Sequence, residues 1–283
     1  MNNQIYPCLW FDGNAKQAAE LYCSIFNDSK ITADTPMVVN FELYGKKMMG
    51  LNGGPMFKIN PSISMMVTCA SNEEIEIVWS KLIEGGTAMM ALDKYPWSEK
   101  YGWVMDKFGM TWQLMLGELP PNGQKIVTTF LFVGDVYGKA QDAIELYTSI
   151  FPNSQAYELQ RYKEGEGQQV GSLKFGHFSL AKNLFAAMDG FGAHDFKFNE
   201  GVSLVVNCDT QEEIDNYWNK LTRDGGEESR CGWLKDKFGV SWQIVPTILG
   251  MLISNLDKAP KVMQAFMQMK KIDIKQLEDA ANI

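Results

Sequence analysis

One twelve-residue stretch occurs twice in this chain and constrains its fold more than any other feature. Gly102–Gln113 reads GWVMDKFGMTWQ and Gly232–Gln243 reads GWLKDKFGVSWQ, with eight of twelve positions identical at a separation of 130 residues. A match of this quality is not chance, so the sequence predicts an internal duplication. Each copy has the pattern of a strand, a tight turn at Asp-Lys-Phe-Gly and a second strand in which apolar and polar residues alternate.

Helix patterns repeat at corresponding places in the two copies. Apolar residues recur every three to four positions over Ala15–Phe26 and over Lys139–Phe151, which predicts a helix in each copy. A second pair of helices is predicted at Asn72–Ile83 and Gln211–Thr222. Each of these begins with a capping box, in which a hydroxyl residue caps the helix and a glutamate three positions later bonds back. The two boxes are Ser71 with Glu74 and Thr210 with Glu213.

Short extended runs surround these helices. Their apolar residues either alternate with polar ones or are continuous, as expected for half-buried and fully buried strands. The predicted strands are Pro7–Phe11, Val38–Leu43, Lys47–Asn52 and Ile63–Cys69 in the first copy, and Phe130–Val133, Leu173–Leu180, Leu184–Asp189 and Val202–Cys208 in the second.

The repeat also predicts how the chain is divided. Residues 1–118 and 125–246 are expected to form two domains of the α+β class, joined by a linker at residues 119–124 that contains proline and glycine. Residues 247–283 lie outside the repeat and are predicted to form a helical tail, with Asp273 as the cap of its last helix.

Composition excludes several classes of function. The net charge of −8 disfavours a general nucleic-acid surface or an anionic membrane surface as partner. The five cysteines form no CxxC pair, which is typical of buried thiols in a reducing compartment. The N-terminus lacks the pattern of a secretory signal, and no window of about 18 apolar residues predicts a membrane span. We therefore expect a cytoplasmic location.

Several motifs together resemble a known family. They are FDGNA, AAELY, NGGP, EEIxxxWxKL and GWxxDxFGxxWQ, with KKIDIKQLEDA in the tail. In this order they resemble the PhnB-like branch of the vicinal-oxygen-chelate superfamily (glyoxalase, bleomycin-resistance and dioxygenase proteins) in its tandem form. This branch is often labelled 3-demethylubiquinone-9 3-methyltransferase. The resemblance implies two tandem domains, each of paired βαβββ modules that form a curved mixed sheet.

The resemblance also implies where a metal would bind. Catalytic members hold a divalent ion with His and Glu side chains on inner strands, and the ion chelates adjacent substrate oxygens. Gln113 and Gln243 stand at the position of the last Glu ligand, and the first strand offers no histidine. We therefore expect no bound metal and no cofactor. The two histidines, His177 and His194, are expected at the surface or in a supporting role.

The predicted ligand-binding residues follow from the same comparison of the two copies. In the second copy we expect an open pocket lined by Gln243, Asp189 and Trp233, with the insert Arg161–Gln169 as a mobile lid. In the first copy an apolar, aromatic insert at residues 88–101 is expected to plug the cup or to cover the sister domain. The tryptophans have core packing as their alternative role. The first-copy members of the set are Gln113, Asn52 and Trp10.

Three hypotheses about function remain open from the sequence. The first is a metal-independent protein that binds a small, partly aromatic molecule. The second is a divalent-metal-dependent lyase, isomerase or dioxygenase, and the third is a structural or protein-interaction module. The sequence lacks a Gly-rich loop after a strand with a downstream acidic residue, so it gives no support to methyl transfer from S-adenosylmethionine. We expect a pseudo-dimer within the chain, as a monomer or a homodimer.

Overall fold

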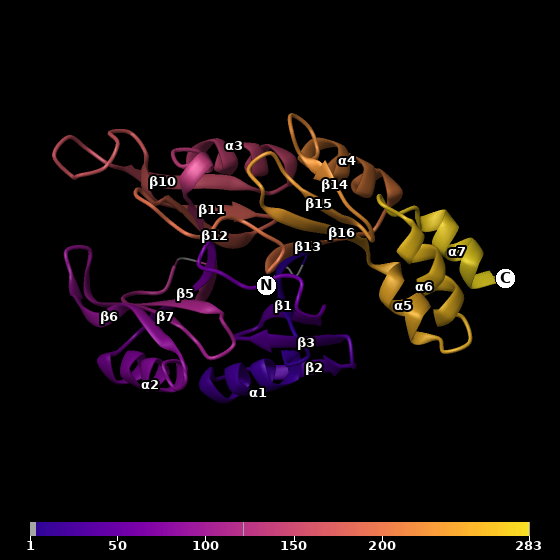
Figure 1. Cartoon of the computed structure of the whole chain (residues 1–283), viewed down its shortest axis with the longest axis horizontal. Coiled ribbons are helices and arrows are strands. Elements are labelled where there is room, and N and C mark those ends of the chain that lie inside the picture. The colour runs from indigo at the N-terminus through magenta and orange to yellow at the C-terminus, as the bar shows by residue number, and fades with distance from the viewer. Residues whose placement is uncertain (1–3, 121, 283) are drawn as a thin grey trace. The chain divides into compact units, whose positions relative to one another are not determined.

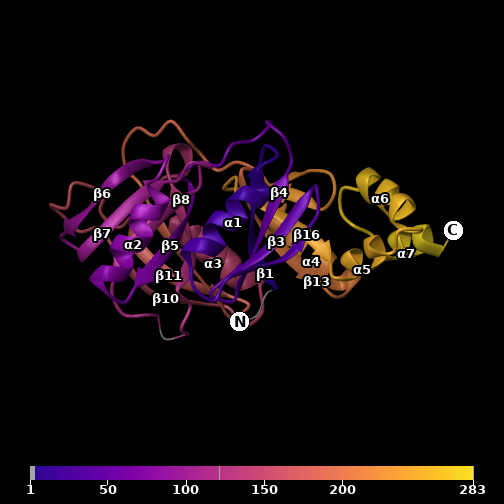
Figure 2. The same cartoon turned by 90° about the horizontal axis from the view of Figure 1, so that it is seen from below.

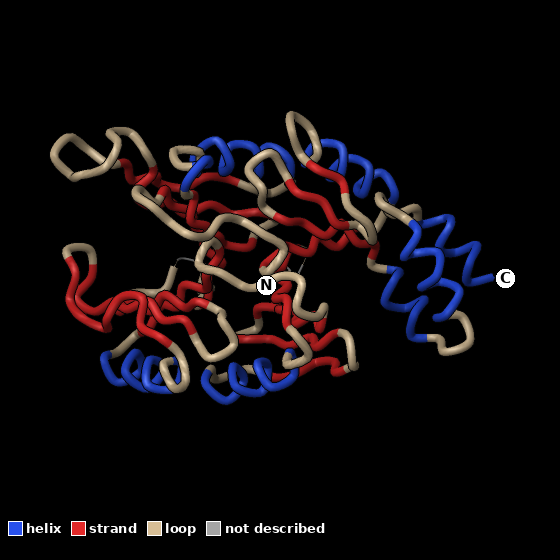
Figure 3. Tube along the Cα trace, viewed as in Figure 1, coloured by secondary structure: helices blue, strands red, loops and turns tan. Residues whose placement is uncertain are grey.

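The computed structural model describes residues 4–120 and 122–282. Residues 1–3, Pro121 in the predicted linker and the last residue of the tail lie outside the described residues. The chain divides into two compact units, one built on residues 7–202 and the other on residues 4–6 and 203–283. Its strands form two eight-stranded mixed sheets, which confirms the α+β class (Figures 1 and 3). Within the described residues, no helix is long and apolar enough to cross a membrane.

The first sheet, called sheet B here, lies within residues 7–202. Its strand order is β10-β11-β12-β9-β5-β8-β7-β6. At its centre β5 runs antiparallel to β9, with Met65 opposite Thr128. The second half of the first copy and the first half of the second copy therefore share one sheet. The strands are β5 (Ile63–Cys69), β6 (Thr87–Tyr95), β7 (Ser98–Met105), β8 (Thr111–Leu116), β9 (Ile126–Phe132), β10 (Gln155–Arg161), β11 (Leu173–Leu180) and β12 (Asn183–Asp189).

The second sheet, called sheet A, draws four strands from each end of the repeat. From the first copy come β1 (Ile5–Phe11), β2 (Lys30–Asp34), β3 (Val38–Leu43) and β4 (Lys46–Asn52), with β1 parallel to β4. From the second copy come β13 (Val202–Cys208), β14 (Glu227–Glu228), β15 (Trp233–Lys235) and β16 (Ser241–Pro246), with β13 parallel to β16. All eight predicted strands are present, and β9 begins four residues before its predicted start.

Two helices cover one face of sheet B. A Cβ added to Gly102 of β7 would lie 2.6 Å from the side chain of Trp79 in α2 (Asn72–Leu82), so α2 packs against that face. The ring of Tyr147 in α3 (Ala140–Ile150) lies 6.3 Å from that of Phe130 in β9, on the same face. Figure 1 shows both helices on the outer side of their strands. We call the opposite face, which carries Met66 and Gln113, the inner face.

The capping boxes form as predicted, with one difference. Ser71 Oγ accepts a hydrogen bond from Glu74 N at 3.1 Å, while the carboxylate of Glu74 accepts from Ala70 N at 2.7 Å rather than from the cap residue. The second copy repeats this arrangement at Thr210 and Glu213, at the start of α4 (Gln211–Leu221). Each box therefore joins its helix to the loop that precedes it. The predicted first helix is α1 (Ala15–Ile25), and a 3-10 turn, η1 (Gly134–Val136), precedes α3.

Asp106, the turn aspartate of the first motif, forms hydrogen bonds both within its turn and with side chains outside it. Asp106 Oδ1 accepts from Phe108 N and Met110 N, as expected of an aspartate at a turn. Its other oxygen accepts from the Tyr22 hydroxyl of α1 and from Trp112 Nε1, both at 2.8 Å. Burial raises the pKa of Asp106, and these hydrogen bonds oppose the rise because they favour the carboxylate.

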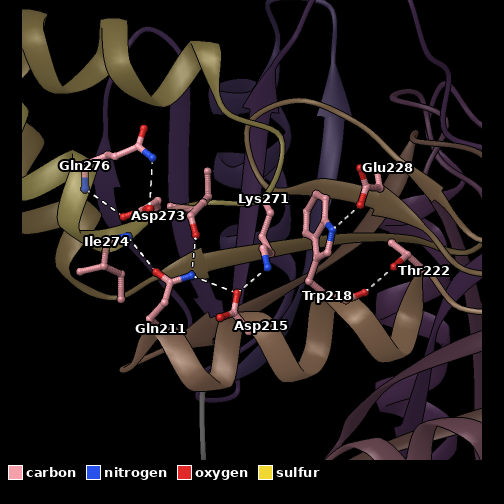
Figure 4. Close-up of polar contacts among 10 residues, drawn as sticks. Gln211, Asp215, Trp218, Thr222, Glu228, Lys271, Asp273, Ile274 and Gln276 are labelled. Atoms are coloured by element: carbon pink, nitrogen blue, oxygen red, sulfur yellow. Dashed lines mark hydrogen bonds and ion pairs between the residues drawn. The ribbon is translucent and has the colours of Figure 1, made fainter.

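The helical tail consists of α5 (Ile248–Ser254), α6 (Ala259–Gln268) and α7 (Ile274–Asn282), which lie side by side (Figure 2). Asp273 caps α7, as predicted, by accepting from Gln276 N at 3.0 Å. Figure 4 shows how the tail is fixed: the Gln211 amide donates to Ile272 O at 3.0 Å and accepts from Ile274 N at 2.9 Å. Lys271 also pairs with Asp215 of α4.

The tail also completes the second copy of the repeated motif. In the first copy β7 pairs with β6, and Asp93 lies opposite Tyr101. In the second copy Cys231 N donates to Met269 O and Gly232 N donates to Lys270 O, each at 2.8 Å. The turn between α6 and α7 therefore supplies backbone partners where the first copy uses a strand.

Candidate functional site

A connected set of polar side chains lies on the inner face of sheet B. Gln113 of β8 is 1% exposed; its Oε1 accepts from the Tyr101 hydroxyl and its Nε2 donates to Ser64 Oγ, both at 2.7 Å. Tyr101 comes from β7 and Ser64 from β5, so the three adjacent strands position this chain of hydrogen bonds. Burial raises the pKa of Tyr101, which keeps its hydroxyl protonated and able to donate. Gln113 is thus held in one orientation.

Trp103 lies directly beside this chain. It is opposite Gln113 in the β7–β8 register, so both side chains are on the inner face. Its Nε1 is buried and has no hydrogen-bond partner among the described residues. A buried donor without a partner costs about 1–3 kcal/mol. This indole N–H is therefore available to an acceptor that the chain itself does not provide.

Apolar side chains make up the neighbouring part of the inner face. Met66 of β5, Val127 of β9, and Leu184 and Ala186 of β12 form a buried cluster, on which Phe175 and Met188 pack. Methionine side chains adapt to ligands of different shape because they are unbranched and flexible.

Gln124, immediately before β9, forms side-chain hydrogen bonds to the backbone of β9 and of the neighbouring strand β12. Its Nε2 donates to Leu184 O at 2.7 Å and its Oε1 accepts from Leu184 N at 2.8 Å. The same Nε2 also donates to Ile126 O. The predicted linker therefore ends on a residue that belongs to the core of sheet B.

His177 lies on the same face, in β11 opposite Ala186. Its ring contacts that of Phe175 edge-on, with centroids 4.8 Å apart. Burial lowers the pKa of His177, so the imidazole is neutral at pH 7. The side chains that make up this part of the inner face therefore carry no charge at neutral pH.

The insert of the first copy forms an edge hairpin of sheet B. Residues 88–101 become most of β6 and the first half of β7. Near its tip Tyr95 stacks on Trp97 with ring centroids 5.1 Å apart, and both rings contact Tyr101 at 5.7 Å. Trp97 is 55% exposed. An aromatic group thus runs from the solvent to the tyrosine that holds Gln113.

Two of the predicted first-copy site residues have structural roles. Asn52, at the end of β4, accepts from Ala15 N at 3.0 Å and donates to Pro36 O at 2.8 Å. Its amide therefore caps α1 and fixes a loop. Trp10 of β1 donates from Nε1 to Gly54 O at 2.7 Å and packs edge-on against Phe57.

Asp189 is the second-copy counterpart of Asn52 and has the same structural role, which is to bond the start of a helix and a neighbouring backbone segment. Its Oδ1 accepts from Gly138 N and Ala140 N at the start of α3, and its Oδ2 accepts from Leu173 N at 2.7 Å. Asp189 is 3% exposed and belongs to β12 of sheet B. Its carboxylate is fully engaged by backbone donors.

Gln243 and Trp233 lie opposite each other in the register of β15 and β16 in sheet A. Gln243 Nε2 donates to Ser203 Oγ at 2.8 Å, which repeats the bond of Gln113 to Ser64. Cys231 stands where the first copy has Tyr101, and among the described residues no donor reaches Gln243 Oε1. The structure brings Gln243 and Trp233 together, whereas Asp189 belongs to the other sheet.

Sequence reasoning missed three members of the inner-face set, namely Tyr101, Ser64 and Trp103 in its role as a donor. The signal was present in the alternation of β7, because Tyr101 and Trp103 are two residues apart and so share a face. What the alternation did not give was the neighbouring strand, and with it the partner of Gln113.

Comparison with known proteins places the chain in a family. The family model described as 3-demethylubiquinone-9 3-methyltransferase matches residues 3–115 and again residues 124–245. The chain belongs to this family. The two successive matches confirm the tandem duplication and the PhnB-like resemblance. A search of curated proteins found no match.

Some solved structures similar to this family member match less than half of the chain, and others match most of it. The PhnB protein from Bacillus cereus is 34% identical, covers 40% of this chain and 98% of its own, and has a TM-score of 0.38. Glyoxalase I from Zea mays is 10% identical, covers 84% of this chain and 89% of its own, and has a TM-score of 0.56. The latter similarity shows the fold, which is the tandem vicinal-oxygen-chelate fold.

The inner face of this family member does not fit the metal ligands that the superfamily resemblance implies. Its possible ligand atoms come from the hydroxyls of Ser64, Tyr101, Thr111 and Thr129, the Gln113 amide and the His177 imidazole. None of these is a carboxylate, and the amide is already bonded at both ends. Among the described residues, no group of three or more His, Cys, Asp or Glu side chains could hold a metal ion. We derive no chemical step through a metal.

Proposed function

We propose that the inner face of sheet B binds a small, partly aromatic molecule and that binding needs no metal ion. The observation that carries the proposal is the fixed Gln113, held by Tyr101 and Ser64 beside the unpartnered indole N–H of Trp103. A few oriented polar groups on an otherwise apolar surface are typical of small-molecule sites.

Two other activities receive less support. A lyase, isomerase or dioxygenase that uses a divalent ion would need ligands that the inner face lacks. The family is described as a methyltransferase family, but the sequence has no loop suited to S-adenosylmethionine. A binding protein could instead act by sequestering its ligand, which requires affinity and no reacting group.

The proposal is tested by nuclear magnetic resonance on protein labelled at its methionine methyl groups. Met66, Met115 and Met188 lie on the inner face, whereas Met65 is the neighbour of Met66 in β5 and faces the helices. A panel of neutral aromatic fragments at millimolar concentration should shift the first three signals and leave Met65 unchanged. Each signal is assigned by a Met→Leu variant.

Two controls make the result decisive. Adding a strong chelator should leave the shifts unchanged, because no metal takes part. Shifts confined to the tail methionines, such as Met251 and Met267, would place the binding elsewhere and contradict the proposal. So would shifts that appear only after a divalent metal has been added.

A further inference from the structure

Several polar groups of the inner face keep a hydrogen that the chain does not use, and they can donate it to a ligand. The buried Thr111 hydroxyl, two residues before Gln113 in β8, is one of them and has no partner among the described residues. Trp103 Nε1 has no partner among the described residues. Ser64 Oγ accepts from Gln113 Nε2, and the hydrogen of its own hydroxyl is not used in any hydrogen bond of the described chain. A hydroxyl that accepts from one side remains a donor on the other.

The direction of the hydrogen-bond chain explains why donors are left over. Tyr101 donates to Gln113, and Gln113 donates to Ser64. The tyrosine occupies one lone pair of the amide oxygen, and the second hydrogen of Gln113 Nε2 is unused like that of the Ser64 hydroxyl. The chain therefore ends on a donor, and it ends beside a second donor on Trp103.

The electrostatics of the face restrict the charge of a ligand. The buried cluster around Met66 and Ala186 is apolar, and His177 packs against Phe175. The nearest carboxylate in the strand register is Asp93 of β6, which is exposed and lies opposite Tyr101. An anion on this face would lose its hydration without gaining a counterion, which is costly.

We infer that the ligand of this site is an uncharged aromatic molecule whose acceptor oxygen, of the carbonyl type, takes the hydrogen bond of Trp103 Nε1. This inference rests on the proposed function and adds the class of ligand. Trp103 acts here as the residue that determines specificity, with Ser64 as a second donor within the same face. The aromatic group of Tyr95 and Trp97 extends the apolar surface on which a planar ring packs.

The test uses three fragments of matched size: acetophenone, ethylbenzene and benzoate. Acetophenone carries a carbonyl acceptor, ethylbenzene has none, and benzoate has acceptors with a negative charge. We expect acetophenone to bind about tenfold tighter than ethylbenzene, and benzoate to bind most weakly, by titration of the Met66 methyl signal. Acetophenone should also move the indole N–H signal that disappears in Trp103→Phe.

Matched variants separate specificity from folding. Trp103→Phe should bring acetophenone down to the affinity of ethylbenzene and leave ethylbenzene binding unchanged. Trp79→Phe, the same change on the helix-covered face of sheet B, should alter neither affinity. If Trp103→Phe is unstable, the shift of the Trp103 indole N–H signal when acetophenone is added to the wild-type protein provides an independent readout.

The outcomes distinguish this inference from the proposed function. Equal affinity for acetophenone and ethylbenzene on the inner face, or tighter binding of benzoate, would overturn the ligand class while leaving the site in place. Preference for acetophenone that survives in Trp103→Phe would also overturn it. If none of the fragments shifts Met66, Met115 or Met188, the proposed function itself is wrong.

Discussion

Gln113 and Gln243 occupy equivalent positions but differ in their partners. Gln113 is bonded at both ends, to Tyr101 and Ser64, whereas Gln243 bonds to Ser203. Replacing Gln113 with alanine leaves two buried hydroxyls without their partner, and each unsatisfied group costs about 1–3 kcal/mol. We expect Gln113→Ala to lower the free energy of unfolding by about 2 kcal/mol, and Gln243→Ala by about 1 kcal/mol.

Denaturant unfolding of the two variants measures this difference, and Trp112→Ala provides the scale. Trp112 is fully buried, so its truncation should cost about 3–5 kcal/mol. Equal losses in Gln113→Ala and Gln243→Ala would mean that the Tyr101 bond contributes nothing. A loss for Gln113→Ala as large as for Trp112→Ala would make the glutamine a core residue rather than part of a binding face.

Lys46 is a second residue with a measurable signature. It is 5% exposed, donates to Thr128 Oγ1 at 2.9 Å and lies 5.3 Å from the centre of the Phe185 ring. Burial lowers its pKa to about 7. The unfolded lysine titrates at about 10.4, so the unfolded chain binds more protons between these values and stability rises with pH across this window.

Lys46→Met should remove this dependence while keeping the length of the side chain. The variant is expected to be more stable than the wild type at pH 7, by a few kcal/mol at most, with the gap closing as the pH approaches about 10. Urea unfolding at several pH values between 6 and 10 measures the gap. A gap in stability that stays constant across this range would contradict this account, because it would mean that burial does not lower the pKa of Lys46.

At the scale of elements, helices followed the sequence closely because their ends carry local signals. The capping boxes place the start of α2 and α4 at the predicted residue. Strands β2 and β10 were not predicted, since Lys30–Asp34 and Gln155–Arg161 are largely exposed edge strands. Their stability comes from pairing with a neighbour, β3 or β11, and a strand that buries little of its own surface leaves no periodic pattern in the sequence.

The tail gives a prediction at this scale. Gln211 holds the backbone on both sides of Asp273 with one amide. Gln211→Ala should weaken the docking of α7 by about 1–2 kcal/mol and speed amide hydrogen exchange in residues 272–282. Asn72→Ala is the matched control, because Asn72 is the first residue of α2 as Gln211 is of α4. Unchanged exchange in the tail of Gln211→Ala would contradict this account.

At the scale of the whole molecule, the sequence identified the duplication but not the way in which its halves combine. Alternation tells which face of a strand is buried, and it does not tell which strand lies beside it. Sheet B joins β5 of the first copy to β9 of the second. The predicted domain boundaries at residues 118 and 125 follow the repeat and remain a prediction, while strand pairing runs across them. Gln113 was identified from its motif, and its partners required the fold.

The shared sheet predicts how a separated half would behave. β5 is buried along its entire length and has β8 on one side and β9 on the other. A fragment of residues 1–124 lacks β9 and exposes one edge of β5, which favours self-association. We expect it to form dimers or larger species by light scattering, and a one-to-one complex when co-expressed with residues 125–283. A stable monomeric fragment would contradict the importance of the β5–β9 pair.

The hydrogen bonds of Cys231 and Gly232 with Met269 and Lys270 also have a consequence in time. The first copy closes its motif with residues that precede it in the chain, so the partner already exists when the motif is made. The second copy must wait for residues that follow it by 38 positions, since Lys270 comes after Gly232. At a synthesis rate of about 5–20 residues per second, this delay is about 2–8 seconds. During that interval the nascent second motif lacks these backbone partners and can form non-native contacts. Binding to a chaperone or to the ribosome surface would prevent such contacts.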